Sequence, residues 1–596
     1  MAAETSTDGF TEVQKRYLEG FMSGLQLGRS AGLRGPSKQA VASDAEPTGP
    51  DAAHIRAQNR FLGEGKKLSE QEVIKREQHP FDGFDRLKEE SRTNSPPSAA
   101  DAFRWRWFGL FFQPMVGKTY MCRARVPNGS VKHWQFAELA NLTERYGNGK
   151  VQISTRANLQ IRDVQSKDTI TVIQAYQEIG LTGLASGADN VRNVIGNPAA
   201  GIDPQELLDT RPYGKELHFQ LLSDRSLSGI PRKFNVAFDG GGIIPLVEEG
   251  NDVAFVATSI KGGFGVEPGI WFRLWIGGVP PHNIFAKDSG IIVRPSDAAK
   301  LSVAIVRVFI DYGNRAARNK ARLKYLLDEI GPQKFFELVE ERYGNKLTRV
   351  SADAISDRPP ADRTAHIGVR PQKQAGLNWI GVAMPLGMMT SEQVRGLAKL
   401  AHDLGDGDIR TTIWQNLLVS GIADHNVPLA TAAIEALGLA VKASPIRTGL
   451  VACTGTLGCK YANTATKRHA LEIASWCEAR VAIDTPLNIH VTGCPNSCAQ
   501  AGISDIGLLG TKVSKSEEED SVEGYHIFAG GSFGPNGTFG KEVFRDVPAD
   551  EAPSFVESLL RAYLTNRTAP DEPFVVFASR YDGEALKKLA EAEAAT

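Results

Sequence analysis

The fold is decided by two stretches of this sequence, KVQISTRANLQIRD at residues 150–163 and DIRTTIWQNLLVSG at residues 408–421. Both follow a Gly-x-Gly turn, and both have the pattern of β structure. They stand 258 residues apart, and the alignment continues without a gap from residue 127 to residue 181. The matching pairs include Pro127 with Pro385, Gly129 with Gly387, Asn158 with Asn416, and Gly180 with Gly438.

A second repeated block has an offset of 253 residues. Asp252 matches Asp505, Gly277 and Gly278 match Gly530 and Gly531, and Pro295 matches Pro548. Chance would not place paired glycines, turn prolines and the apolar pattern together over this length, and the period is far too long for a solenoid. We therefore expect two related halves, at roughly 103–330 and 365–575, joined by a connector.

The order of elements within each half indicates an α+β fold. Each half is expected to run strand, turn, helix, Gly-x-Gly turn, another strand (residues 150–163 and 408–421) and a second helix. This β-α-β-β-α-like order is typical of ferredoxin-like packing, and the later parts add strands and a closing helix. The expected boundaries are an N-terminal extension at 1–102, half-domains at 103–186 and 365–444, larger domains at 187–345 and 445–596, and a connector at 346–364.

Composition excludes several classes of protein. The 596 residues include 68 Lys and Arg against 69 Asp and Glu, which argues against a chain-wide nucleic-acid-binding surface. We find no secretory signal and no apolar stretch of the ~20 residues that span a bilayer, so a cytoplasmic protein without a membrane partner is expected. Residues 10–28 predict an amphipathic helix and residues 29–52 a flexible linker, whose roles the sequence does not give. Residues 53–100 are expected to be helical in places.

Cysteines are sparse and clustered. Five of the six lie between residues 453 and 498, and in a cytosolic chain such clusters indicate metal or redox chemistry rather than disulfides. The spacings Cys453-x5-Cys459 and Cys494-x3-Cys498 suit a [4Fe–4S] cluster, while a zinc site and unligated thiols remain alternatives. Cys477 and Cys122 are interpreted as small core residues.

A family resemblance rests on these cysteines and on motifs spread over roughly 80–580. Cys-x5-Cys followed by Gly-Cys-Pro-Asn-Ser-Cys resembles the signature of the siroheme nitrite and sulfite reductases, and TRANLQIRD, DNVRNVIGNPAAGIDP, PRKFN, GVRPQKQAGLNWIGV and GLVACTG extend it. The resemblance implies that each half is a ferredoxin-like half-domain plus an α/β domain of siroheme and Fe–S type, with the cofactors at their interface. It also implies that the [4Fe–4S] cluster is bound by Cys453, Cys459, Cys494 and Cys498, and that Cys498 supplies the axial thiolate to the siroheme iron.

Basic residues of the first half are candidates for an anion site, because siroheme carries eight carboxylates and the substrate is an anion. Arg123, Arg156, Arg232, Lys233 and Asn235 stand on segments that we interpret as strands, although any one of them alone is more often a solvated surface residue. The repeat adds that Arg156 aligns with Trp414. The resemblance implies substrate contacts from Arg123, Arg156, Lys233 and Asn235, and siroheme contacts from Arg232, Gln160, Arg192, Arg322 and Lys324.

The expected reaction is the reduction of nitrite to ammonium. In the family that this chain resembles, sulfite reductases tend to carry Lys-x-Lys where this chain has Lys233-Phe234-Asn235, so Asn235 favours nitrite. No G-x-G-x-x-G follows a strand, so an external electron donor is needed, and reduced ferredoxin or a similar acidic protein is the simplest one. A monomer is expected. The alternatives are a sulfite reductase of the same build and a non-catalytic Fe–S or zinc protein of the same fold.

Overall fold

A computed structural model describes residues 46–514 and 521–594. The predicted helix at 10–28 and most of the predicted linker at 29–52 lie outside the described residues. Within the described part of the chain, no helix combines the length and the apolar character that crossing a membrane requires.

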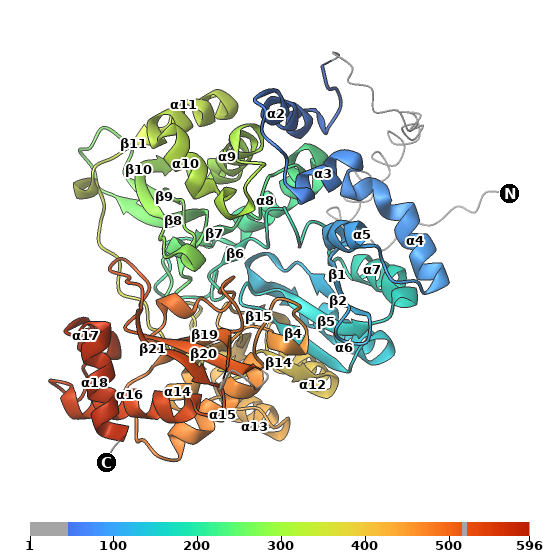
Figure 1. The fold of residues 1–596 in the computed structure, drawn as a ribbon. Coiled ribbons are helices and arrows are strands. Elements are labelled where there is room, and N and C mark those ends of the chain that lie inside the picture. Colours follow the sequence, from blue (N-terminus) through green and yellow to red (C-terminus); the bar gives the residue numbers. More distant parts are fainter. Residues whose placement is uncertain (1–45, 515–520, 595–596) are drawn as a thin grey trace. The chain divides into compact units, whose positions relative to one another are not determined.

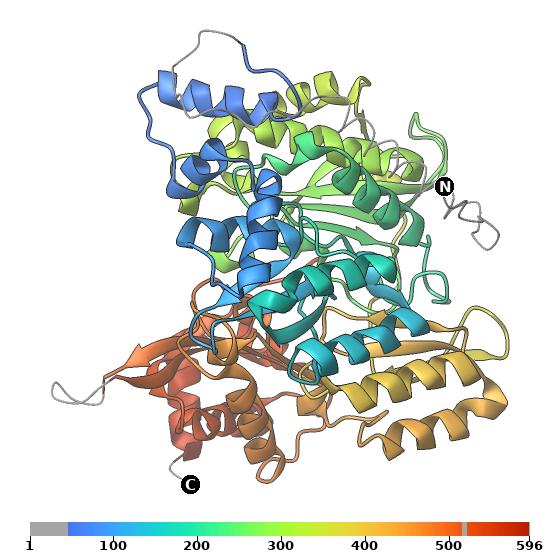
Figure 2. The ribbon, with the colours of Figure 1, turned by 90° about the vertical axis from the view of Figure 1, so that its right-hand side faces the viewer.

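Four helices precede the repeated halves, as the sequence predicts for residues 53–100. They are α2 (Ala52–Gly63), α3 (Glu70–Glu77), α4 (Phe84–Thr93) and α5 (Ala99–Arg104). Figure 2 shows these blue helices beside the green domain that follows. The buried Glu72 carboxylate pairs with Arg315 at 2.6 Å, and Lys75 lies 3.5 Å from the buried carboxylate of Asp189. The contact with Asp189 ties helix α3 to the segment that leads to Arg192.

Two five-stranded antiparallel sheets correspond to the ferredoxin-like halves. The first half contributes β1 (Leu110–Gln113), β2 (Thr119–Ala124), β3 (Ser130–Lys132), β4 (Lys150–Ile153) and β5 (Leu159–Val164), with α6 (His133–Tyr146) and α7 (Thr169–Glu178). The second contributes β12 (Gly368–Pro371), β13 (Leu377–Val382), β14 (Met388–Thr390), β15 (Asp408–Thr411) and β16 (Leu417–Ala423), with α12 (Ser391–Leu404) and α13 (Val427–Ala436).

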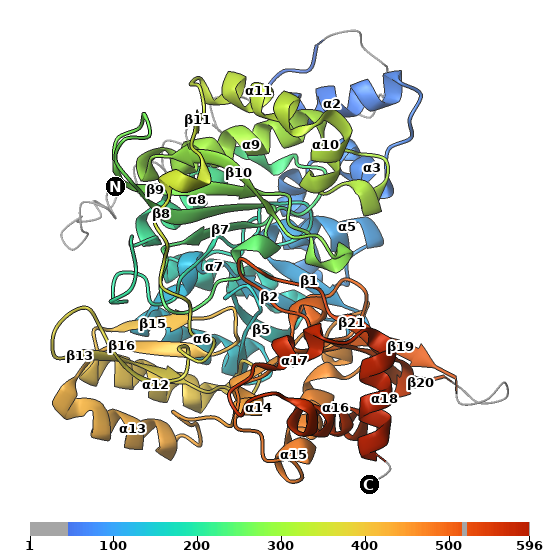
Figure 3. The ribbon, with the colours of Figure 1, turned by 90° about the vertical axis from the view of Figure 1, so that its left-hand side faces the viewer.

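The two halves exchange one strand each. β3 pairs with β15, with Lys132 opposite Asp408, and β14 pairs with β4, with Met388 opposite Gln152. A single hydrophobic core spans both halves, and α6 lies against α12 (Figure 3). The duplication therefore produces one interlocked unit with an approximate two-fold relation between its parts.

Two glycines make this exchange possible. Gly129 and Gly387, which are matched in the repeat, have φ of +69° and +73°. A Cβ atom at Gly129 would lie 2.1 Å from the carbonyl oxygen of Thr411, and one at Gly387 would lie 2.6 Å from that of Ile153. Because both contacts are with the opposite half, any side chain at these positions would separate the exchanged strands.

Each half then builds a larger mixed sheet covered by helices (Figure 1). In the first half these are β6 (Ile195–Gly196), β7 (Val236–Asp239), β8 (Val253–Ile260), β9 (Gly269–Ile276), β10 (Lys287–Val293) and β11 (Thr348–Arg349), with α8 (Arg211–Ser223), α9 (Ala298–Tyr312), α10 (Leu323–Ile330) and α11 (Pro332–Tyr343). In the second half they are β17 (Gly449–Ala452), β18 (Asn488–Thr492), β19 (Ile506–Val513), β20 (Val522–Ala529) and β21 (Lys541–Pro548), with α14 (Pro445–Thr448), α15 (Thr466–Glu478), α16 (Ala552–Asn566), α17 (Phe574–Ser579) and α18 (Gly583–Ala594).

The repeat in these larger sheets extends to individual hydrogen bonds. The buried Asp252 carboxylate accepts from the backbone N–H of Asn235 at 2.8 Å, and its repeat partner Asp505 accepts from that of Asn488 at 2.7 Å. Because the same bond recurs at the same offset of 253, the second block is a true structural repeat. The expected α+β fold with two pseudo-repeated halves is confirmed.

Candidate active site

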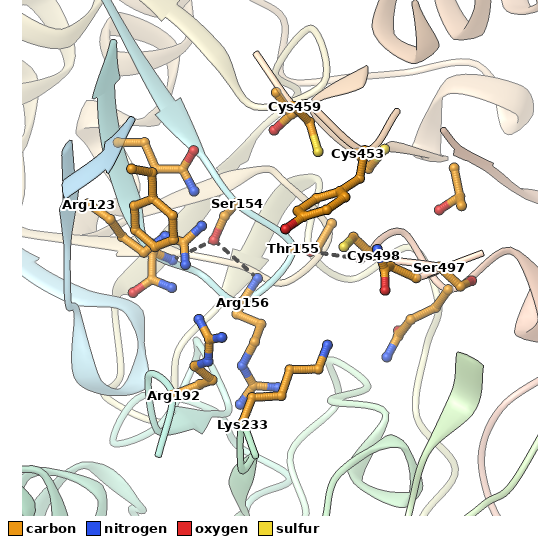
Figure 4. Close-up of a pocket in the computed structure, with 18 of the residues that line it drawn as sticks. Arg123, Ser154, Thr155, Arg156, Arg192, Lys233, Cys453, Cys459, Ser497 and Cys498 are labelled. Atoms are coloured by element: carbon orange, nitrogen blue, oxygen red, sulfur yellow. Dashed lines mark hydrogen bonds between the residues drawn. The ribbon is translucent and has the colours of Figure 1, made fainter. Parts of the chain in front are cut away.

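A cavity of about 390 Å³ lies between the two halves. The first half lines it with β2, the β4–β5 turn and the segment before β7, and the second half lines it with the loops that follow β17 and β18. Figure 4 shows Arg123, Arg192 and Lys233 on one side of this pocket and Cys453, Cys459 and Cys498 on the other. A side chain from either half can therefore act on a group bound in the middle.

The four clustered cysteines all line this pocket. Cys453 directly follows β17, and Cys494 and Cys498 lie in the loop after β18. β17 and β18 are adjacent parallel strands, so their carboxyl ends meet at one edge of the sheet and place the two cysteine loops side by side. Cys122 and Cys477 are fully buried in hydrophobic cores, as expected, although Cys477 lies in the last turn of α15 rather than at its middle.

Polar groups surround the sulfur atoms. The backbone N–H of Gly493 donates to Cys453 Sγ at 3.2 Å, and the Asn496 amide donates to Cys494 Sγ at 3.6 Å. Burial raises the pKa of the Cys453 thiol to about 11, which keeps it protonated until a metal replaces the proton. Donors aimed at sulfur stabilise the negative charge of bound thiolates.

The rest of the pocket is strongly basic. Among the residues that the structure describes, its lining contains no Asp or Glu and eight cationic side chains: Arg106, Arg123, Arg156, Arg162, Arg192, Lys233, Arg322 and Lys460. Buried cations without counter-charges are unfavourable unless an anion joins them. This lining fits a ligand that carries several negative charges.

Arg123 and Arg192 share one anchor. Both guanidinium groups donate to the carbonyl oxygen of Ser186, at 3.2 and 3.0 Å, and Arg123 also lies over the Phe111 ring. The Nε atoms of both arginines are buried without a hydrogen-bond partner among the described residues. Burial, reinforced by the neighbouring Arg162, lowers the pKa of Arg123 to about 10. Both side chains are therefore held in place with donors still available.

Arg156 is placed differently from the prediction. It lies in the turn between β4 and β5 rather than on a strand, because residues 150–163 form a hairpin. Its guanidinium donates to Asn251 Oδ1 at 3.0 Å and to the carbonyl oxygen of Asn193 at 2.9 Å. Burial lowers its pKa to about 9. Arg156 therefore ties the turn to the larger domain and keeps a buried Nε free.

Lys233 and Asn235 also lie ahead of a strand rather than on one, since β7 begins at Val236. Burial, together with repulsion from Arg322, lowers the pKa of Lys233 to about 7, and its side chain extends into the pocket (Figure 4). Among the described residues the Lys233 ammonium has no hydrogen-bond or ion-pair partner. The Oδ1 atom of Asn235 is buried and likewise unpartnered.

The remaining predicted siroheme contacts divide into two groups. Gln160, Arg192 and Arg322 line the pocket, and Arg322 is already engaged in a two-pronged ion pair with Asp252 at 2.6 and 2.9 Å. Arg232 and Lys324 are not among the lining residues. Contrary to the prediction, Arg232 does not lie on a strand, because β7 begins only at Val236. Lys324 forms an ion pair with Asp328, an exposed residue on the same helix.

Sequence reasoning missed Arg162, Arg106, Lys460 and Tyr461, which also line the pocket. Arg162 is the most informative of them, because its guanidinium donates to Thr454 in the first cysteine loop at 3.0 Å. Strand periodicity could have found it, since Arg162 follows Gln160 by two residues on β5 and points to the same face. Lys460 and Tyr461 directly follow Cys459, and that adjacency could have found them, whereas Arg106 had no signal beyond residue type.

Comparison with known proteins identifies this arrangement. The family model for the nitrite and sulphite reductase 4Fe-4S domain matches residues 187–347 and 447–593. The model for the nitrite/sulfite reductase ferredoxin-like half domain matches residues 113–179 and 370–437.

The chain belongs to the nitrite and sulphite reductase family.

Similar relatives carry two kinds of name. The ferredoxin–nitrite reductase of Synechococcus elongatus is 36% identical over 77% of this chain and 88% of its own length. The chloroplastic ferredoxin–nitrite reductase of Zea mays is 34% identical over 83% of this chain and 89% of its own length. Sulfite reductase [ferredoxin] 2 of Mycolicibacterium paratuberculosis is 30% identical over 81% of this chain and 89% of its own length. The solved structure of the Mycobacterium tuberculosis NirA protein matches with a TM-score of 0.81 and 28% identity, over 88% of this chain and 98% of that one.

The family's cofactors are siroheme and a [4Fe–4S] cluster, and the residues of this pocket fit both. Four thiols line one cavity, which is the number a [4Fe–4S] cluster takes, although among the described residues they are not drawn together as a preformed metal-ligand group. The carboxylates of siroheme need several cations, and the buried unpartnered donors of Arg123, Arg156, Arg162 and Arg192 face the same cavity. The predicted cofactors are confirmed, and the zinc alternative loses its support.

Proposed function

We propose that this protein reduces nitrite to ammonium, a reaction that takes six electrons and eight protons. The observation that carries the proposal is one pocket that combines four cysteines with eight cations and no carboxylate. The ferredoxin–nitrite reductases cited above, at 34% and 36% identity over most of this chain, support nitrite as the substrate.

The cysteines have distinct roles in this proposal. Cys453, Cys459 and Cys494 would hold the cluster, and Cys498 would hold the cluster together with the siroheme; all four cysteines line the pocket. When bound, these two groups supply single electrons and an iron atom that takes nitrite. The hydroxyl of Thr155 donates to the carbonyl oxygen of Cys498 at 3.0 Å, so a residue of the first half orients the shared cysteine.

The basic residues bind and orient anions. Arg123, Lys233 and Asn235 face the cavity with donor or acceptor atoms free, and we assign them with Arg156 to nitrite. We assign siroheme carboxylates to Gln160, Arg192 and Arg322, which line the pocket. Arg232 and Lys324 lie outside the lining and would contact siroheme only from there. An ammonium whose pKa has been lowered to about 7 is also a good proton donor, so Lys233 is the first candidate for delivering protons to the departing oxygens.

The names of the relatives support reduced ferredoxin as the electron donor. The donor's docking site, a monomeric state and a cytoplasmic location stay predictions.

A steady-state comparison tests the choice of substrate. With reduced ferredoxin or a reduced viologen as donor, kcat/KM for nitrite is expected to exceed that for sulfite by well over tenfold. A ratio below one would reassign the protein to sulfite, the activity named for the relative at 30% identity. A purified protein without siroheme absorption would instead support the non-catalytic alternative.

The Asn235→Lys variant tests the basis of that choice. Sulfite carries more charge than nitrite, so a second ammonium beside Lys233 is expected to lower the nitrite-to-sulfite ratio of kcat/KM by about tenfold, or ~1.4 kcal/mol in differential binding. The substitution breaks no hydrogen bond of Asn235 Oδ1, because that atom is buried without a partner among the described residues. An unchanged ratio would show that another residue sets the preference.

A further inference from the structure

Helix α15 begins against one of the cluster cysteines. The hydroxyl of Thr466, its first residue, donates to the carbonyl oxygen of Cys453 at 2.7 Å and lies 3.7 Å from Cys453 Sγ. The first turn of α15 therefore contacts the cysteine directly.

The next residue of this helix is a buried lysine. The Lys467 side chain is almost entirely enclosed, and its ammonium donates to the carbonyl oxygen of Leu386. Among the described residues no carboxylate pairs with it. Burial lowers the pKa of Lys467 to about 7, repulsion from Arg162 acts in the same direction, and negative charge on the Cys453 sulfur acts in the opposite direction. An enclosed ammonium with one neutral acceptor costs free energy that some other negative charge must offset.

The repeat shows that the fold itself does not need this lysine. At the offset of 253 Lys467 corresponds to Gly214 of α8, and at the offset of 258 Leu386 corresponds to Asn128. Leu386 and Asn128 share a left-handed conformation, with φ of +55° and +53°. In the first half, Gly214 packs so tightly on Asn128 that a Cβ atom would lie 1.9 Å from Asn128 Oδ1. The same helix–turn junction thus forms without a cation in the half that has no cysteine cluster.

We propose that Lys467 is a positioning residue for the iron–sulfur cluster: its ammonium compensates the negative charge of the cluster and its thiolates, and so raises the reduction potential of the cluster. This rests on the assignment of the four cysteines to the cluster, and it is independent of which anion the enzyme reduces. Charge close to a cluster is one of the means by which a protein sets the potential.

The test is a redox titration of purified holoenzyme, with the reduced cluster followed by electron paramagnetic resonance. Lys467→Gln removes the charge but keeps a donor for the carbonyl oxygen of Leu386. At a fixed potential the ratio of reduced to oxidised cluster is expected to fall about tenfold, which corresponds to 59 mV for one electron. Lys467→Arg, which keeps the charge, is expected to restore the wild-type ratio.

A matched control lies in the same domain. The Lys541 ammonium also donates to backbone carbonyl oxygens, those of Ala578 and Tyr581, and Lys541 lies on β21, at the opposite edge of the sheet from β17 and the first cysteine loop. Lys541→Gln is expected to leave the potential of the cluster unchanged. A shift of equal size in this control would overturn the proposal.

The remaining outcomes are also decisive. A wild-type potential in Lys467→Gln with full iron and sulfide content would overturn the role of Lys467. Loss of the cluster from Lys467→Gln but not from Lys467→Arg would support the proposal, because the charge would then be needed to keep the cluster bound. Loss of the cluster from both variants would overturn it, because Lys467 would then have only a packing role. Absence of the cluster signal from the wild-type protein would refute the cluster assignment itself.

Discussion

Replacing Cys498 with alanine is expected to lower nitrite reduction by roughly a thousandfold or more, since it removes the thiolate to which we assign the link between the two cofactors. Cys498 lies in the loop after β18, where it lines the pocket and is exposed to it. Its carbonyl oxygen is bonded by Thr155, so its backbone should stay in place when the sulfur is lost. Activity with a reduced viologen, siroheme absorption and iron content are the measurements.

Cys477→Ala is the matched control for this variant. Cys477 is fully buried in the core of the same domain, and burial raises the pKa of its thiol to about 12. Its replacement is expected to cost on the order of 1 kcal/mol of stability and to leave both cofactors bound. Full activity in Cys498→Ala, or equal loss of cofactors from both variants, would contradict the assignment of Cys498.

Replacing Lys233 with methionine is expected to lower kcat/KM for nitrite by about a hundredfold, a loss of ~2.7 kcal/mol in transition-state stabilisation. The Lys233 ammonium extends into the cavity without a partner among the described residues, so the variant removes a charge and a proton donor without breaking a contact. Lys215→Met provides the control, because Lys215 is an exposed residue of α8 outside the pocket lining. Comparable losses in the two variants would contradict a specific role for Lys233.

The pH dependence gives a second check on Lys233. Burial lowers the pKa of this group to about 7, and the protonated form is the one that attracts nitrite and donates a proton. As pH rises through that pKa the ammonium loses its proton, so kcat/KM should fall on the alkaline side. The carboxylates of bound siroheme act to raise the pKa, so the fall is expected at or above pH 7 and not below it. Lys233→Arg should remove this limb, because arginine stays protonated.

The sequence alone was sufficient for the duplication and the fold class, and it singled out the four cysteines that line one pocket. Periodicity and turn glycines are local signals, and they repeat at 258 and 253 residues. The spacings Cys453-x5-Cys459 and Cys494-x3-Cys498 are also local, since each pair lies in a single loop. These features can be recognised in the sequence because backbone geometry within a few residues produces them.

The exchange of β3 and β14 between the halves could not be read from the sequence. A three-residue strand carries no information about which sheet it joins, and that choice depends on contacts such as Gly129 with Thr411. For the same reason the sequence predicts one strand at 150–163, whereas the structure has a hairpin that places Arg156 in its turn.

The division of labour among the basic residues was decided only by the tertiary structure. The sequence does not distinguish the four cations of this region, which are Arg232, Lys233, Arg322 and Lys324. In the structure Arg322 is paired with Asp252, and Lys324 forms an ion pair with Asp328 outside the pocket lining. Arg232 also lies outside that lining, so of these four only Lys233 reaches the cavity without a partner among the described residues. Sequence determined that this chain has thiols and cations in sufficient number for its cofactors. Which cations remain unpaired depends on burial and on neighbours far away in the chain, because the free energy of a charge is set by everything that surrounds it in three dimensions.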